Sequence, residues 1–254
     1  MNTPWITAHS GCEQLPKDSL ASVDCALELQ ADAAELDVRR TRDGRLYISH
    51  NACTGEEIAQ RITLEQVFDR IRGTGLRMNC DIKEAFAVSS TLDLADSCGI
   101  PREQLILTGA VSAETLAMEP WITERAQVFL NMEEALKYFR VSEFFREKND
   151  DQFATLMTGG LPLTQDLLQQ EAYVEYLIRF VKNLHVSGIN MPHIFLTDSI
   201  IQRFRQEEIA CSVWTVNEEA DINRCLELQV FNITTRAVRR TMKCRKLWMQ
   251  HRAH

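Results

Sequence analysis

The chain has 254 residues, of which 45% are hydrophobic and 25% are charged, and its formal net charge is -8. This composition is that of an ordinary globular protein, and the negative charge argues against a nucleic-acid partner, because phosphate binding requires a concentrated positive surface. The sequence contains no secretory signal, no transmembrane segment and no C-x-x-C pair among its eight scattered cysteines, so we expect a reduced, cytoplasmic protein.

Short apolar runs, which predict buried strands, alternate along the chain with stretches whose apolar residues recur every three or four positions, which predict helices. The pair Asp43-Gly44 predicts a turn that returns the chain into a short second arm at residues 46–50, and Thr63 is a predicted helix N-cap. The other predicted strands are residues 5–9, 33–38, 76–83, 104–111, 126–132, 187–192, 210–217 and 230–235, and the predicted helices are residues 19–30, 63–75, 89–99, 112–119, 198–209 and 218–229.

The longest connection, residues 133–186, is predicted to be mostly helical, with two or more helices and an interruption at residues 158–164. Repeated strand–helix units over this length predict an α/β fold, a (β/α)₈ TIM barrel that forms a single domain over residues 1–254. A doubly wound open sheet is the alternative, but no glycine-rich phosphate loop follows the first strand.

The C-terminal stretch, about residues 238–254, is predicted to be a basic helix. We interpret its charges as a solvent-exposed helix face rather than as a docking patch for an anion. The basic residues are Arg239, Arg240, Lys243, Arg245, Lys246 and Arg252.

Carboxylates, histidines and a lysine lie at the ends of the first predicted strands, and the carboxyl ends of the strands are where the active sites of barrels lie. Strand side chains alternate, so Glu35 and Asp37 share a face. Carboxylates that meet in a pocket of low dielectric repel one another unless a cation lies among them, and oxygen ligands suit one divalent Mg²⁺ or Ca²⁺ rather than zinc. The residues concerned are His9, Glu35, Asp37, His50, Asp81 and Lys83.

Each of these residues also has a structural interpretation. A histidine at a strand end is often a hydrogen-bonded structural group, and the carboxylates could pair with Arg39, Arg40 or Lys83. Their joint position at successive strand ends favours a functional site, in which two histidines are suited to general acid and base roles near neutral pH.

The same residues carry a family resemblance. The segments "AHSG", "PKDSL", "ELDV", "RDG" and "ISHN" resemble the glycerophosphodiester phosphodiesterase family, which reads A-H-R-G, P-E-N-T, E-L-D-V, K-D-G and I-H-D in the same order. "NCDIK" resembles the family's E-I-K strand, and "WTVN" and "ITTR" resemble its closing segments, whereas the middle of the chain, roughly residues 85–180, is uninformative.

The resemblance implies a barrel enzyme that hydrolyses a small phosphodiester with one bound divalent metal ion. By position, it implies metal ligands at Glu35, Asp37 and Asp81, an acid–base pair at His9 and His50, a phosphate-facing Lys83, and Trp214 at the mouth of the pocket.

The chain also departs from the family pattern. Ser10 stands where the family has arginine, Lys17 where it has glutamate, and Asn51 where it has aspartate. We expect Lys17 to replace the lost positive charge at the edge of the site and to bind substrate. Only a short segment separates Asn51 from the next helix, where the family inserts a small subdomain, so we expect a more open pocket.

Two other functions remain open, and the departures favour the first of them. One is a non-catalytic relative that binds a phosphorylated ligand. The other is a barrel lyase or aldolase that uses Lys83 as a Schiff base, although a lysine beside Asp81 should stay protonated. The sequence does not define the natural substrate, the choice between Mg²⁺ and Ca²⁺, which histidine is the acid, or the oligomeric state.

Overall fold

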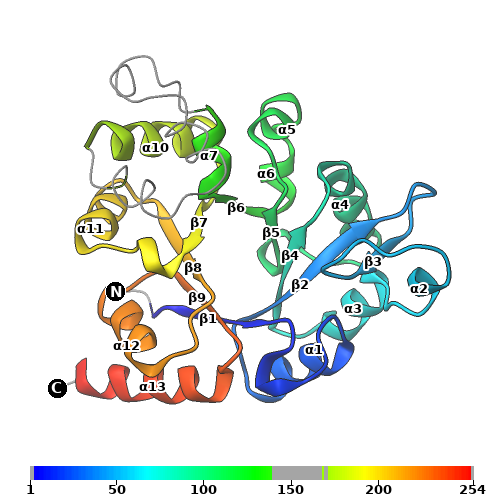
Figure 1. Cartoon of the computed structure of the whole chain (residues 1–254), viewed down its shortest axis with the longest axis horizontal. Coiled ribbons are helices and arrows are strands. Elements are labelled where there is room, and N and C mark those ends of the chain that lie inside the picture. The colour runs from blue at the N-terminus through cyan, green and yellow to red at the C-terminus, as the bar shows by residue number, and fades with distance from the viewer. Residues whose placement is uncertain (1–2, 139–167, 169–170, 253–254) are drawn as a thin grey trace, which may run out of the picture.

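The computed structural model describes residues 3–138, 168 and 171–252. Eight parallel strands form a closed barrel, because β1 pairs with both β9 and β2, and helices surround the strands (Figure 1). The barrel strands are β1 (Trp5–His9), β2 (Ala33–Arg40), β4 (Arg77–Ile82), β5 (Leu105–Gly109), β6 (Gln127–Asn131), β7 (Gly188–Pro192), β8 (Ala210–Trp214) and β9 (Asn232–Thr235).

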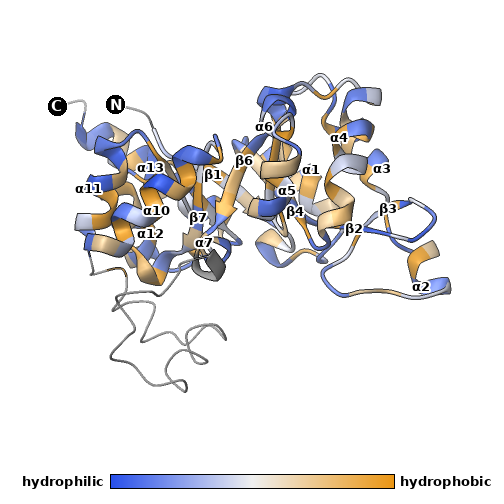
Figure 2. Cartoon of the chain, turned by 90° about the horizontal axis from the view of Figure 1, so that it is seen from above, coloured by the Kyte–Doolittle hydropathy of each residue, from blue (hydrophilic) through white to orange (hydrophobic). Residues whose placement is uncertain are grey.

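Among the described residues, one further strand lies outside the closed ring. β3 (Leu46–Ile48) pairs antiparallel with the end of β2, after a turn at Gly44, whose φ is +97°. β3 and the short α2 (Glu56–Ala59) project at the right of both views (Figures 1 and 2). The predicted turn is therefore confirmed, but the strand is shorter than expected and ends two residues before His50.

The helices that cover the outer face of the barrel follow the predicted order, except that the short α6 was not predicted. Thr63 caps α3 as predicted, since Gln66 N donates to Thr63 Oγ1 at 3.2 Å and Thr63 N donates to Gln66 Oε1 at 2.9 Å. The helices are α1 (Leu20–Glu28), α3 (Leu64–Ile71), α4 (Val88–Ser97), α5 (Ala113–Met118), α6 (Ile122–Arg125), α7 (Met132–Tyr138), α10 (Glu171–Asn183), α11 (Asp198–Gln206), α12 (Glu219–Glu227) and α13 (Val238–Arg252).

The long connection between β6 and β7 contains α7 and α10, in line with the expectation of at least two helices. The predicted interruption at residues 158–164 lies outside the described residues. Within the described part of the chain, no helix combines the length and the apolar content that crossing a membrane requires.

The interior of the barrel changes in character from one end to the other. Apolar side chains close the amino end, where the ring centroids of Trp5 and Phe231 are 4.5 Å apart and those of Phe129 and Phe231 are 5.3 Å apart. Buried polar groups fill the middle, such as Thr7, whose Oγ1 donates to Asn232 Oδ1 at 2.7 Å. Charged side chains gather at the carboxyl end. The main apolar core packs between the strands and the helices, where Figure 2 shows hydrophobic residues on the strands.

The basic helix α13 is present, but it is more than a solvated surface. Arg245 is only 13% exposed, pairs with Asp32 and donates to Pro4 O at 3.0 Å. Arg239 pairs with Glu13 at 3.5 Å. The interpretation of a purely solvent-exposed face is therefore wrong for Arg245, because this residue ties α13 to the segments around β1.

Candidate active site

A pocket of about 600 Å³ opens at the carboxyl end of the barrel strands. This is the end at which βα loops form active sites in barrels of this kind. All eight predicted site residues line this one pocket, although they come from five strands or strand-following loops: His9, Lys17, Glu35, Asp37, His50, Asp81, Lys83 and Trp214.

Strand register brings the three acidic side chains together. His9 on β1 pairs in register with Glu35 on β2, and Asp37 on β2 pairs with Asp81 on β4. Alternation then points Glu35, Asp37 and Asp81 to the same side of the sheet, into the barrel. One carboxylate oxygen from each lies within 4.8 Å of the others. The predicted convergence of the three carboxylates is present.

Lys83 follows β4 and bridges two of these carboxylates. Its Nζ lies 2.6 Å from Asp81 Oδ2 and also contacts Asp37 Oδ1. Burial alone would lower the pKa of Lys83, but the adjacent Asp81 and Asp37 outweigh burial and raise it. Lys83 is therefore an ammonium ion held between two acids.

The carboxylates differ in their ionisation. Burial, together with the charges of Asp81 and Asp37, raises the pKa of Glu35 well above its usual value. Burial also raises the pKa of Asp81, against the opposing effect of Lys83. For Asp37, burial alone would also raise the pKa, but hydrogen bonds and charge contacts with Lys83 and His50 outweigh burial and lower it.

The donor set fits a divalent cation. Three carboxylate oxygens lie close together in a half-buried pocket, and a single lysine does not neutralise them all. Burial is the main cause of the raised pKa of Glu35, and the charges of Asp81 and Asp37 add to it; a cation would offset both effects. Oxygen ligands are those that Mg²⁺ and Ca²⁺ prefer.

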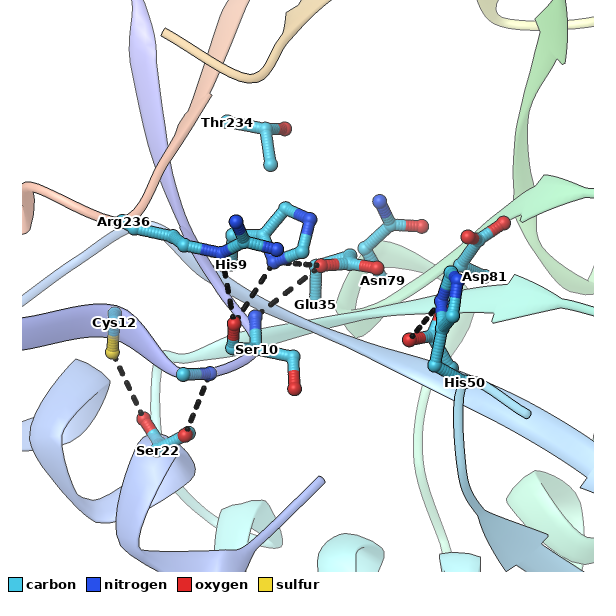
Figure 3. A network of polar contacts seen from close by, with 12 residues as sticks. His9, Ser10, Cys12, Ser22, Glu35, His50, Asn79, Asp81, Thr234 and Arg236 are labelled. Carbon is cyan, nitrogen blue, oxygen red and sulfur yellow. Dashed lines mark hydrogen bonds and ion pairs between the residues drawn. The ribbon is translucent and has the colours of Figure 1, made fainter. Parts of the chain in front are cut away.

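His9 lies beside Glu35 and is half-buried. Its Nδ1 is 3.0 Å from Ser10 O and 3.4 Å from Glu35 Oε2 (Figure 3). A carbonyl oxygen can only accept, so Nδ1 carries the hydrogen and Nε2 of the neutral ring holds the lone pair. Burial lowers the pKa of His9, and the nearby charge of Arg236 adds to this effect. His9 is thus disposed to stay neutral.

His50 occupies a different environment, with 68% of its side chain exposed. Its Nδ1 lies 3.1 Å from Asp37 Oδ2, and its backbone N donates to Asp18 Oδ2 at 3.1 Å. Arg39 holds the backbone of the same loop, because its guanidinium donates to His50 O at 2.7 Å and pairs with Glu84. Arg39 therefore positions the His50 loop and does not pair with the acidic cluster.

Ser10 and Lys17 show what the departures from the family pattern do. Ser10 is buried, and its hydroxyl donates to Asp18 Oδ1 at 3.0 Å and accepts from Asp18 N at 2.8 Å. Ser10 thus connects the loop after β1 to the residue that holds His50. Lys17 is exposed at the edge of the pocket.

The wall of the pocket opposite the acidic cluster is mostly uncharged. Asn190 Nδ2 donates to Asn131 Oδ1 at 2.9 Å, and Trp214 lies at the end of β8 beside them. Amide groups and an indole ring offer hydrogen bonds and apolar contact for the part of a ligand that lies away from the carboxylates.

Sequence reasoning missed several pocket residues. Asn79 follows the inward-facing alternation of β4 and could have been found from that period. Arg236 lines the pocket from the end of β9, and Asp18 connects Ser10 to His50. Both lie in segments that resemble the family pattern, "PKDSL" and "ITTR", but their roles depend on contacts with distant segments.

Comparison with solved structures supports the fold. A glycerophosphodiester phosphodiesterase from Parabacteroides distasonis superposes with a TM-score of 0.72 at 16% identity, over 100% of this chain and 99% of that one. Among curated proteins, YqiK of Bacillus subtilis, which is described as uncharacterized, is 26% identical over 87% of this chain and 90% of its own length. A probable glycerophosphodiester phosphodiesterase 1 from Mycobacterium tuberculosis is 39% identical over 70 residues, which are 25% of this chain and 26% of that protein.

The class of protein follows from these observations: a (β/α)₈ barrel enzyme that hydrolyses phosphoric diesters. The model of the glycerophosphoryl diester phosphodiesterase family matches residues 9–238. The chain belongs to that family.

Proposed function

We propose that this protein is a metal-dependent phosphodiesterase that acts on a small glycerophosphodiester or a related phosphodiester. The observation that carries the proposal is the convergence of three carboxylates, two histidines and a lysine around one pocket at the carboxyl end of the barrel. A binding protein without activity would need neither the acidic cluster nor the pair of histidines.

Glu35, Asp37 and Asp81 would together hold one divalent cation, Mg²⁺ or Ca²⁺. When bound, such an ion polarises a phosphoryl oxygen and offsets the negative charge that develops during attack. The three side chains orient their oxygens for this role because neighbouring strands fix them in register.

The remaining groups act on the substrate directly. Lys83 places a permanent positive charge at the edge of the acidic cluster, where it stabilises the phosphoryl oxygens in the transition state. His9, which stays neutral, accepts the proton of the attacking hydroxyl or water at Nε2. His50, held on the opposite side by Asp37, donates a proton to the departing alkoxide.

The exposed position of His50 and the short segment that contains α2 support an open pocket. Such a pocket accepts a leaving group of varied size, while the uncharged wall at Asn131, Asn190 and Trp214 contacts that group. The aldolase alternative finds no support, because the raised pKa of Lys83 keeps its amine protonated.

The proposed location is the cytoplasm. All eight cysteines are free thiols, and seven of them are buried. This supports a reducing compartment.

The test of the proposed activity is hydrolysis of bis(p-nitrophenyl) phosphate by the wild type and His9→Ala, with Mg²⁺ or with EDTA. His251→Ala is the matched control, because His251 is exposed on α13 and does not line the pocket. We expect release of nitrophenol that requires both metal and His9 and is unchanged in His251→Ala. Hydrolysis that persists in EDTA, or no hydrolysis of this and other phosphodiesters, would remove the proposal.

A further inference from the structure

Arg236 is a cation of the pocket that takes no part in the proposed catalytic steps. It follows β9 directly, lines the same pocket as His9 and is half-buried. Figure 3 shows its side chain extending from the end of β9 toward His9 and Ser10. The residue thus reaches the pocket from the strand that closes the barrel against β1.

The position of Arg236 is fixed by its surroundings. Its backbone N donates to Asn217 Oδ1 at 2.9 Å, and its carbonyl accepts from Glu13 N at 2.9 Å. Its Nε donates to Ser10 O at 3.3 Å. A guanidinium that is held at Nε keeps its two terminal nitrogens in a defined plane, so less side-chain entropy is lost when it binds a ligand.

The guanidinium charge is not neutralised by a neighbouring acid. Among the residues that the structure describes, no ion pair joins Arg236 to a carboxylate, whereas Lys83 is paired with both Asp37 and Asp81 and Arg39 is paired with Glu84. Arg236 therefore brings a positive charge to the pocket that does not serve an internal ion pair.

Arg236 also lies next to the chemistry. Ser10 O accepts from both His9 Nδ1, at 3.0 Å, and Arg236 Nε, at 3.3 Å. The imidazole and the guanidinium are thereby held side by side on one carbonyl. An anionic group that engages the terminal nitrogens of Arg236 would lie beside His9.

We propose that Arg236 is a substrate-binding residue that grips the phosphoryl group through its terminal guanidinium nitrogens. The inference rests on the proposed function insofar as the ligand is a phosphate ester. A planar guanidinium donates two parallel hydrogen bonds to phosphate oxygens, which the neutral Ser10 cannot do. Lys17, a flexible and exposed side chain at the rim, contributes less to this contact than the fixed Arg236.

The test compares Arg236→Gln and Arg236→Lys with Arg239→Gln. Glutamine keeps an N–H donor for Ser10 O but removes the positive charge. Lysine keeps the charge but lacks the planar set of N–H donors of a guanidinium. Arg239 is a matched control because it is exposed on α13, is paired with Glu13 and does not line the pocket. Calorimetry measures the affinity of each protein for glycerol 3-phosphate in the presence of Mg²⁺, and thermal unfolding checks the fold.

We expect Arg236→Gln to weaken glycerol 3-phosphate binding by about 10- to 100-fold, since hydrogen bonds to charged groups contribute on that scale. The affinity of Arg236→Lys should lie between those of the wild type and Arg236→Gln. Arg239→Gln should bind glycerol 3-phosphate like the wild type. In parallel, Arg236→Gln should raise the KM for bis(p-nitrophenyl) phosphate. If Arg236→Gln does not fold stably enough to compare, the reduced affinity expected of Arg236→Lys still tests the inference.

The outcomes separate this inference from the proposed activity. Binding of glycerol 3-phosphate that depends on Arg236, in a protein that hydrolyses no diester, would support the inference and contradict the activity. Hydrolysis with a KM that is the same in Arg236→Gln and the wild type would support the activity and overturn the inference. An equal loss of binding in Arg239→Gln would also overturn it.

Discussion

The backbone of Gly109 leaves room for the carboxylate of Asp81. A β-carbon at Gly109 would overlap Asp81 Oδ1 and Ile82 O and would lie 2.9 Å from Ile82 N. The φ of Gly109 is +79°, a conformation that residues with a β-carbon adopt at a cost. The end of β5 therefore sets the position of an acidic side chain on β4.

The first prediction follows from this packing. Gly109→Ala should destabilise the protein by about 1–3 kcal/mol and weaken Mg²⁺ binding, because Asp81 must move. Gly99→Ala is the control, since Gly99 has a φ of +69° but no atom within 4 Å of its β-carbon position. It should lose stability through backbone strain alone and bind Mg²⁺ like the wild type. Equal metal affinity in Gly109→Ala and Gly99→Ala would contradict the link to Asp81.

Lys83 competes with a cation for the same oxygens, because it contacts both Asp37 and Asp81. Lys83→Met should therefore bind Mg²⁺ about tenfold more tightly while losing about 100-fold in kcat, since its charge acts on the transition state. Lys83→Arg, which keeps the charge, should not bind Mg²⁺ more tightly. Calorimetry and initial rates measure the two effects, and weaker metal binding in Lys83→Met would show that Lys83 organises the ligands instead.

The raised pKa of Glu35 makes the stability of the metal-free protein depend on pH. A carboxyl whose pKa is higher in the folded state contributes stability that is present below its unfolded pKa and is lost as pH rises through its folded pKa. In EDTA, the free energy of unfolding should fall as pH rises from the ordinary pKa of a glutamate toward the raised pKa of Glu35, and less steeply in Glu35→Gln. Urea titrations at each pH measure the free energy of unfolding of both proteins. Parallel curves for the two proteins would show that Glu35 is not the group responsible.

Lys17 lies at the rim of the pocket and is exposed. Lys17→Ala should raise the KM for substrate with little change in kcat, because a charge at the rim acts on binding rather than on the chemical step. The increase should be smaller than that of Arg236→Gln. Steady-state kinetics decide this, and an unchanged KM would leave Lys17 without a role.

Much of the fold and the acidic part of the site could be predicted because both depend on local periods. Alternation along β2 places Glu35 and Asp37 on one face, and strand order in a barrel brings Asp81 beside Asp37. The pair Asp43-Gly44 and the cap at Thr63 are likewise local features, and both are present.

The roles of Arg236, Gly109 and Arg245 depend on contacts with other segments of the chain. Arg236 reaches Ser10 only because β9 pairs with β1, a contact across 226 positions of sequence. Gly109 matters through the space it leaves for a side chain on the adjacent strand. The basic tail was misinterpreted at Arg245 for the same reason, since its partner Asp32 is distant in sequence. Contacts between segments that are distant in sequence leave no periodic pattern in the sequence.

The most direct measurement is the number of divalent ions that the metal-stripped protein binds, determined by calorimetric titration with Mg²⁺ and Ca²⁺. We predict one ion per chain for the wild type and loss of that binding in Asp37→Asn, with the fold intact by circular dichroism. A wild type that takes up no ion, or an Asp37→Asn variant that binds one as tightly as before, would contradict the assignment of Glu35, Asp37 and Asp81 as a cation site.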